Sequence, residues 1–170
     1  MAGRRIVDMV HEDLVLSRIL TRQAFENAIK TLAAIGGSTN AVIHLIAMAG
    51  RIGVKLTIED FDHLGSELSC LVNLQPSGKY LMEDFCYAGG LPVVMKQIAH
   101  LLHGDAITVT GKTMAENIAS AENFNADVIM PLARIAPNVV EKGVVALDHN
   151  FRVALAHGAH VAFGLYRPPV

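Results

Sequence analysis

The sequence predicts an α/β protein that is helix-rich over residues 1–135 and β-rich in a tail over residues 136–170. Along residues 23–35, apolar side chains recur every three or four positions, as they do on the buried face of an amphipathic helix. The stretch 91–102 has Pro92 in its first turn and no later helix breaker, which also favours a helix. After residue 139, valines and alanines are interrupted by glycines, a pattern typical of strands and hairpins.

The N-terminal segment is expected to form two helices. Residues 5–20 have the spacing of a short helix followed by a looser connection. Thr21 is placed to cap the helix over residues 23–35, because its side chain can accept a hydrogen bond from the first turn. Gly36 is expected to end that helix.

The next predicted helix differs because it is apolar on nearly every side. Ser38 or Thr39 is expected to cap it, and it runs through the sequence AVIHLIAMA to about Arg51. A helix that is apolar all round is normally covered on most of its sides. We therefore expect this one to be buried.

Shorter elements follow in the second half. Residues 54–56 are expected to be extended, Thr57 to cap a helix over IEDFDHL, and the run LSCLVNL to form a buried strand or a packed turn. The stretch QPSGKYLMEDFCYAGG is rich in turn formers and is expected to be a loop. Residues 106–109 are predicted to form a short strand, with Thr113 capping a helix that ends near Ser120.

Composition and charge exclude several classes of protein. The chain has 170 residues, of which 52% are hydrophobic and 18% charged, and its net charge is -2. A nearly neutral chain without a basic run lacks the electrostatic footprint of a nucleic-acid-binding protein. Its longest apolar run is far shorter than the roughly 18 residues of a membrane span, and acidic residues interrupt the stretch that a signal peptide would need. We expect a soluble, cytoplasmic protein with neither nucleic-acid nor membrane partners.

Metal-binding and redox signals are weak. Cys70 and Cys86 have no CxxC spacing and no histidine at ligand spacing, so we expect reduced thiols in or near a core. Glu83 and Asp84 are adjacent carboxylates that could serve a divalent cation or be the acidic first turn of a helix. No Ser-His-Asp or Cys-His arrangement follows from the spacing, and no catalytic residue is assigned.

Two stretches could meet an anion. In GGSTN, two glycines precede a capped helix whose N-terminus offers N–H groups and partial positive charge, which would suit a carboxylate or phosphate; the alternative is a plain helical corner. His44 lies one helical turn beyond the cap, as a pocket residue or as a core histidine. GKT resembles the end of a phosphate loop, but the glycine required at position 106 is Ala106, so Lys112 is expected to be solvated.

Four motifs carry a resemblance to a known family. They are GGSTNAVIHLIAMA, LVNLQPSGKYLMEDF, YAGGLPVVMKQI and ITVTGKTMAENI, in this order between about Gly3 and Pro131. Together they resemble the dihydroxy-acid and sugar-acid dehydratases, which include dihydroxy-acid, 6-phosphogluconate and arabonate-type dehydratases. The resemblance implies that residues 1–135 are part of the family's large N-terminal α/β catalytic domain. Residues 136–170 match only faintly and are interpreted as a divergent tail.

The resemblance also implies an activity. Family members are hydro-lyases that convert a 2,3-dihydroxy acid, a small-molecule substrate, into a 2-keto acid, and we expect the whole enzyme to be a homo-oligomer. They use an iron–sulfur cluster held by three cysteines and a magnesium ion held by carboxylates and a modified lysine, with a serine as base. Those groups lie in family segments that have no matching position here, so no metal ligand is assigned to this chain.

The resemblance gives the GGSTN corner a role. It implies that Ser38, Thr39 and Asn40 face the substrate as hydrogen-bond donors. His44, one helical turn beyond the cap, is added to these candidate substrate-binding residues because of its spacing. The chain is then an interior segment of a dehydratase, and alone it is expected to lack turnover. Its apolar helix would be left partly bare without the rest of the enzyme. The alternative is a non-catalytic ligand-binding or interaction module that retains this anion-binding corner.

Overall fold

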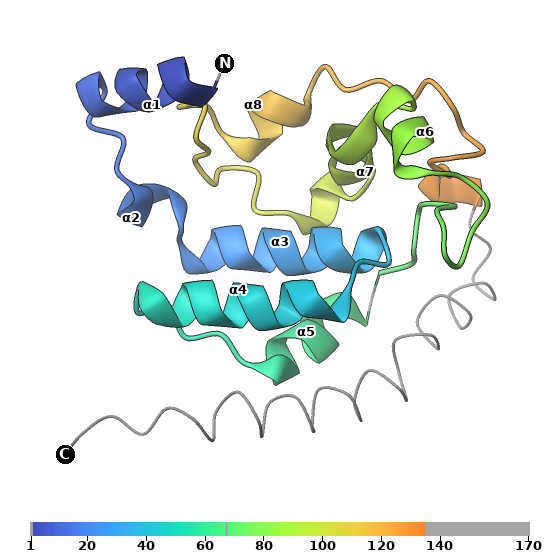
Figure 1. The fold of residues 1–170 in the computed structure, drawn as a ribbon, viewed down its shortest axis with the longest axis horizontal. Coiled ribbons are helices and arrows are strands. Elements are labelled where there is room, and N and C mark those ends of the chain that lie inside the picture. The colour runs from blue at the N-terminus through green and yellow to red at the C-terminus, as the bar shows by residue number, and fades with distance from the viewer. Residues whose placement is uncertain (1, 67, 135–170) are drawn as a thin grey trace.

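The computed structural model describes residues 2–66 and 68–134 (Figure 1). The predicted strand-rich tail, residues 136–170, lies outside the described residues. The helices, in chain order, are α1 (Ala2–His11), α2 (Leu16–Ile19), α3 (Arg22–Ala34), α4 (Thr39–Arg51), α5 (Ile58–Gly65), α6 (Met82–Tyr87), α7 (Gly90–Gln97), the 3-10 turn η1 (Ala99–Leu101), α8 (Met114–Ile118) and the 3-10 turn η2 (Leu132–Arg134).

Helix α3 is the central element. It packs against α4 and α5 on one side and against α7 on the other (Figure 1). The predicted cap is confirmed, because the Thr21 hydroxyl accepts a hydrogen bond from the Ala24 N–H at 3.3 Å. Phe25 and Ile29 point into the shared core, where they are 4% and 1% exposed. The helix that carries the chain into the GGSTN corner is therefore held from both sides.

Apolar side chains gather in two main clusters, one on each side of α3. The cluster between α3, α4 and α5 includes Phe25, Ile29, Val42, Ala49 and Phe61. The cluster under α6 and α7 is built from residues that are distant in sequence, namely Ala34, Leu68, Leu71, Val72, Phe85, Ala88, Val93, Val94, Ile98, Val128 and Ile129. Because α3 contributes to both, it ties the two halves of the described chain together.

Extended structure is limited in the described residues to isolated bridges. The run LSCLVNL is a packed, extended segment, in which Val72 and Ile129 form an antiparallel bridge and the Asn73 N–H donates to the Val128 carbonyl at 3.0 Å. The predicted strand at residues 106–109 is reduced to a bridge between Ile107 and Thr113, and residues 54–56 form no strand. The α/β prediction is thus too rich in strand for this part, which is helical.

One helix was not predicted from the sequence, and another ends earlier than predicted. The expected loop QPSGKYLMEDFCYAGG contains α6, which forms because the Asp84 carboxylate accepts the Leu81 N–H at 2.8 Å and Phe85 is buried in the core. The helix predicted over residues 91–102 ends at Gln97 and continues as η1. No helix in the described residues is long and apolar enough to cross a membrane.

The expectation that the apolar helix is buried on most sides is wrong for the described chain, whereas the expectation of partly bare apolar surface on it is confirmed. Helix α4 forms over nearly the predicted range, but only Val42 and Ala49 are buried along it. Ile43 is 41% and Met48 is 50% exposed. Within the described chain, α4 has partners only for the side that packs on α3 and α5.

Candidate functional site

The two glycines of GGSTN end α3 with a specific turn. Gly36 has φ +56°, the left-handed conformation that glycine adopts without strain. Its N–H donates to the Ala33 carbonyl at 3.1 Å, and the Gly37 N–H donates to the Leu32 carbonyl at 2.9 Å. These two bonds form a Schellman motif, which satisfies carbonyls that the helix end would otherwise leave without partners.

The two glycines of the GGSTN corner are also closely packed against neighbouring side chains. A Cβ on Gly36 would lie 3.1 Å from the Cys70 Sγ, and a Cβ on Gly37 would collide with the Leu32 side chain. The Leu71 N–H donates to the Ala34 carbonyl at 2.8 Å and fixes the segment beneath the turn. The backbone between α3 and α4 is therefore closely packed at both glycines and hydrogen-bonded to the segment that contains Leu71.

Ser38 is the N-cap of α4. Its side-chain oxygen accepts a hydrogen bond from the Asn40 N–H at 3.2 Å. The cap prediction is thus confirmed, with Ser38 rather than Thr39 in this position. The helix behind it has thirteen residues, so its N-terminus carries a partial positive charge that favours an anion.

The four predicted substrate-binding residues lie at the start of α4 and differ in their exposure. Ser38 and Asn40 are exposed and Thr39 is half-buried. His44 is exposed as well, so it is not a core histidine. Because residues four apart share one face of a helix, Asn40 and His44 lie one turn apart on the same exposed face of α4. The corner can offer a hydroxyl, an amide and an imidazole to a carboxylate or a sugar hydroxyl.

The described residues do not fit the family's metal groups. No three or more His, Cys, Asp or Glu side chains converge there in a way that could hold a metal ion. Cys70 is half-buried, and burial raises the pKa of its thiol, whereas Cys86 is exposed on α6. Glu83 and Asp84 are exposed first-turn residues of α6, as the simpler interpretation predicted. No catalytic step through iron–sulfur or magnesium is assigned to this part of the chain.

Lys112 lies in an exposed loop as expected. Its carbonyl accepts the Thr108 N–H at 2.9 Å, and Thr113 caps α8 by accepting the Glu116 N–H at 3.2 Å. Helix α8 has only five residues, and the loop is held by hydrogen bonds between its own threonines and Asn117. This stretch therefore has a structural role in the described chain.

Sequence reasoning missed a charged stripe along α3. Arg22, Glu26 and Lys30 are spaced four residues apart and share one side of the helix. Arg22 forms a two-pronged ion pair with Asp60 of α5, at 2.5 and 3.0 Å, and a further one with Glu26 at 2.7 Å. The regular spacing of alternating charges was the signal available in the sequence.

The stripe also clamps the segment after η1. Glu26 contacts the His103 ring at 2.6 Å. The buried Asn27 side chain donates to the His103 carbonyl at 3.0 Å and accepts its N–H at 2.8 Å. An amide that satisfies both backbone groups of one residue fixes that residue firmly.

Charge pairing perturbs two carboxylates in the stripe. The hydrogen bonds from Arg22, opposed by burial, lower the pKa of Asp60 from 3.8 to about 2. Burial raises the pKa of Glu26, but hydrogen bonds from Arg22 and His103 outweigh it and leave that pKa below its usual value. Both groups are therefore ionised at neutral pH and act as structural partners of Arg22.

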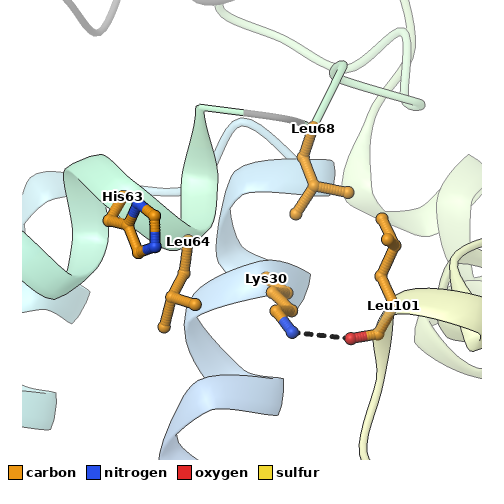
Figure 2. Close-up of a pocket in the computed structure, with 5 residues that line it drawn as sticks. All are labelled: Lys30, His63, Leu64, Leu68 and Leu101. Carbon is orange, nitrogen blue, oxygen red and sulfur yellow. Dashed lines mark hydrogen bonds between the residues drawn. The ribbon is translucent and has the colours of Figure 1, made fainter.

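A small hollow lies beside this clamp (Figure 2). It is lined by Lys30 of α3, His63 and Leu64 of α5, Leu68 and Leu101. The Lys30 ammonium donates a hydrogen bond to the Leu101 carbonyl at 2.6 Å, as Figure 2 shows. This bond joins two of the residues that line the hollow. None of the predicted substrate-binding residues lines it, and the GGSTN corner remains the candidate site.

Comparison with known proteins places this helical segment in a family. The family model described as the dihydroxy-acid/6-phosphogluconate dehydratase N-terminal region matches residues 1–117. The matched range includes α1 to α8 almost entirely, with the GGSTN corner inside it. The chain belongs to the dihydroxy-acid/6-phosphogluconate dehydratase family.

Individual relatives agree. An L-arabinonate dehydratase from Rhizobium leguminosarum bv. trifolii (strain WSM2304) is 55% identical over 152 residues, which cover 88% of this chain and 26% of the relative. An L-arabonate dehydratase from Azospirillum brasilense is 52% identical over 88% of this chain and 26% of its own. Dihydroxy-acid dehydratase 2 from Pseudoalteromonas translucida (strain TAC 125) is 43% identical over 85% of this chain and 28% of its own. The chain thus spans about a quarter of the length of these relatives.

Proposed function

We propose that this chain is a segment of a hydro-lyase that converts a 2,3-dihydroxy acid into a 2-keto acid. The observation that carries the proposal is the family match over residues 1–117, which contains the GGSTN corner. The relatives are named for L-arabinonate, L-arabonate and dihydroxy acids. Substrates of this class share a carboxylate beside a hydroxylated carbon, which a helix N-terminus and neutral polar side chains can bind.

The role proposed for this chain is substrate binding. Ser38, Thr39 and Asn40 would meet the carboxylate and hydroxyl groups at the start of α4, and His44 would contact the same molecule one turn further on. The segment over residues 1–135 would form part of the family's α/β domain. The iron–sulfur cluster, the magnesium ion and the base of the family would be held elsewhere in the enzyme, which we propose is a cytoplasmic homo-oligomer.

A chimera tests this function. The segment of the Rhizobium leguminosarum enzyme that matches this chain would be replaced by this chain, and formation of 2-keto acid from L-arabonate and from 2,3-dihydroxyisovalerate would be measured. We expect turnover of at least one acid. Asn40→Ala and His44→Ala should raise KM more than they lower kcat, because they remove binding contacts. Unchanged KM in both variants would contradict the assigned role.

The 170-residue chain alone provides a second test. With iron, sulfide, magnesium and an aldonic acid added, we expect no 2-keto acid; product would show that this chain holds its own catalytic groups. Titration with L-arabonate, followed through the amide signals of Ser38, Thr39 and Asn40, addresses the non-catalytic alternative. Saturable shifts with no turnover even in the chimera would favour the ligand-binding module.

A further inference from the structure

The GGSTN corner lies against an extended segment from a more distant part of the sequence. We call residues 68–72 the supporting segment. Within it, the Leu71 N–H donates to the Ala34 carbonyl at 2.8 Å, at the end of α3. Beside this bond, the Cys70 Sγ lies 3.1 Å from the point that a Cβ on Gly36 would occupy. The supporting segment therefore contacts the chain directly before the start of α4, at the first glycine of the motif.

The supporting segment is itself anchored in the core. The Leu71 carbonyl accepts the Met130 N–H at 2.7 Å, and Val72 forms an antiparallel bridge with Ile129. Leu71 and Ile129 are both 0% exposed, within the apolar cluster under α6 and α7. A buried, hydrogen-bonded segment of this kind moves only when the core around it opens. It is therefore a fixed support for whatever packs on it.

The contact with the first glycine depends on one side chain. Cys70 is half-buried, and its thiol donates a weak hydrogen bond to the Val72 carbonyl at 3.5 Å, which holds the sulfur in place. Gly36 has no Cβ and φ +56°, so the sulfur fills the space that a side chain would take. Removal of the sulfur would leave a gap beside the turn, and the atoms lining a gap lose their packing contacts.

We propose that Cys70 is a positioning residue that acts through Gly36 and sets where the substrate-binding residues at the start of α4 lie. The inference rests on the proposed function and adds a residue that makes no assigned contact with the substrate. The role uses the size of the side chain and not thiol chemistry. Burial raises the pKa of the Cys70 thiol, so at neutral pH it is an uncharged group that packs like a small apolar one.

Single substitutions in the chimera described above give the first test. Cys70→Ala should raise KM by about threefold, the order of the coupling between residues in contact, and should change kcat less. Cys70→Ser keeps a donor for the Val72 carbonyl and most of the side chain, so its KM should lie closer to that of the parent. Cys86→Ala, at an exposed site on α6, is the matched control and should leave KM and kcat unchanged.

A double-mutant cycle separates positioning from general damage. Gly36→Ala should raise KM by a factor about threefold smaller in the Cys70→Ala background than in the parent, because the new Cβ then has room. The backbone strain of alanine at this φ is present in both backgrounds and cancels. Gly37→Ala collides with Leu32 instead, so its effect on KM should be the same in both backgrounds.

Hydrogen exchange in the 170-residue chain tests the same contact without activity. Cys70→Ala should speed exchange at the Gly37 and Asn40 amides, which are hydrogen-bonded in the corner, and leave the Asn117 amide of α8 unchanged. Equal effects of Gly36→Ala in both backgrounds, or faster exchange at Asn117 as well, would overturn the inference. Faster exchange confined to the corner, with no turnover in the chimera, would support the positioning contact while contradicting the proposed function.

Discussion

Helices α3 and α4 are both thirteen residues long and lie side by side, yet the more polar one is the more deeply buried. Helix α3 carries Arg22, Glu26 and Lys30 and still buries five residues, whereas α4 has its one Asp, Glu, Lys or Arg residue, Arg51, at its last position and buries two. The charges of α3 find partners on α5 and near His103 within the same chain. Among the residues that the structure describes, α4 buries Val42 and Ala49 on the side that packs on α3 and α5, and leaves Ile43 and Met48 exposed.

This difference shows that the polarity of a helix predicts whether its contacts are ion pairs or apolar packing. It does not predict whether the described chain contains the partner for each contact. Helix α3 packs its apolar side into the core while Arg22, Glu26 and Asp60 stay partly exposed, so their pairing avoids the full desolvation cost of a buried ion pair. Helix α4 carries apolar side chains such as Ile43 and Met48 at positions that the described residues leave exposed. Four experiments sharpen the contrast between the two helices.

The largest effect is expected from core truncation. Ile29→Ala on α3 should lower the free energy of unfolding by about 2 to 5 kcal/mol, because it leaves a cavity where the side chain is 1% exposed. Met48→Ala on α4 is the matched control and should change it by less than about 0.5 kcal/mol. Urea unfolding followed by circular dichroism measures both. A larger loss at Met48 would show that α4 is already covered in the isolated chain.

The clamp on His103 should have the next largest effect. Asn27→Ala leaves the N–H and the carbonyl of His103 without their side-chain partner, which should cost about 1 to 3 kcal/mol. Hydrogen exchange at the His103 amide should become faster in the variant. Gln23→Ala, on the exposed side of the same helix, should leave both the stability and the exchange rate unchanged.

Acid should weaken the pairing of α3 with α5. The pKa of Asp60 is about 2 in the folded chain against an ordinary value of 3.8, so its carboxylate stabilises the fold above pH 3.8 and that contribution is lost as the pH falls toward 2. Asp60→Asn should be less stable than the parent at pH 6 by about 1 kcal/mol after solvent screening. The two proteins should converge near pH 2, and a constant difference across this range would contradict the assigned ion pair.

An effect no larger than that of Asp60→Asn is expected at the helix cap. Ser38→Ala should lower stability by about 1 kcal/mol and Ser38→Gly by a few tenths, because the serine side chain accepts one N–H of α4. Thr21→Ala at the start of α3 is the matched control with a similar cost. Thermal unfolding detects both. A much larger loss of stability in Ser38→Ala would mean that the serine makes stabilising contacts beyond this one hydrogen bond.

The sequence predicted the helical framework well where capping chemistry is local. Thr21, Thr113 and the glycines after α3 acted as their types predict, because an N-cap or a Schellman turn needs only its near neighbours. Helix α6 was missed because it has six residues and depends on Phe85 being buried by segments distant in sequence. The predicted strand at residues 106–109 failed because its pairing is limited to a single bridge.

The sequence predicted which residues form the candidate site, but not what surrounds them in three dimensions. The GGSTN motif located the corner and its cap, but whether His44 faces a core or the solvent depended on which side of α4 finds partners. The charged stripe of α3 was visible as a spacing of four residues, whereas its partners Asp60 and His103 are brought to it by tertiary packing. Periodicity reports the face of a helix and carries no information about what lies opposite it.

The glycine turn between α3 and α4 has a consequence for engineering the substrate binding that we propose for this segment. A side chain at residue 37 would displace Leu32, and one at residue 36 would press on Cys70. Most variants at these two positions would therefore need Leu32 or Cys70 to move before the turn could form. Under the proposed binding role, selectivity is better sought at residues 39, 40 and 44, because changes there leave the two glycines of the turn in place.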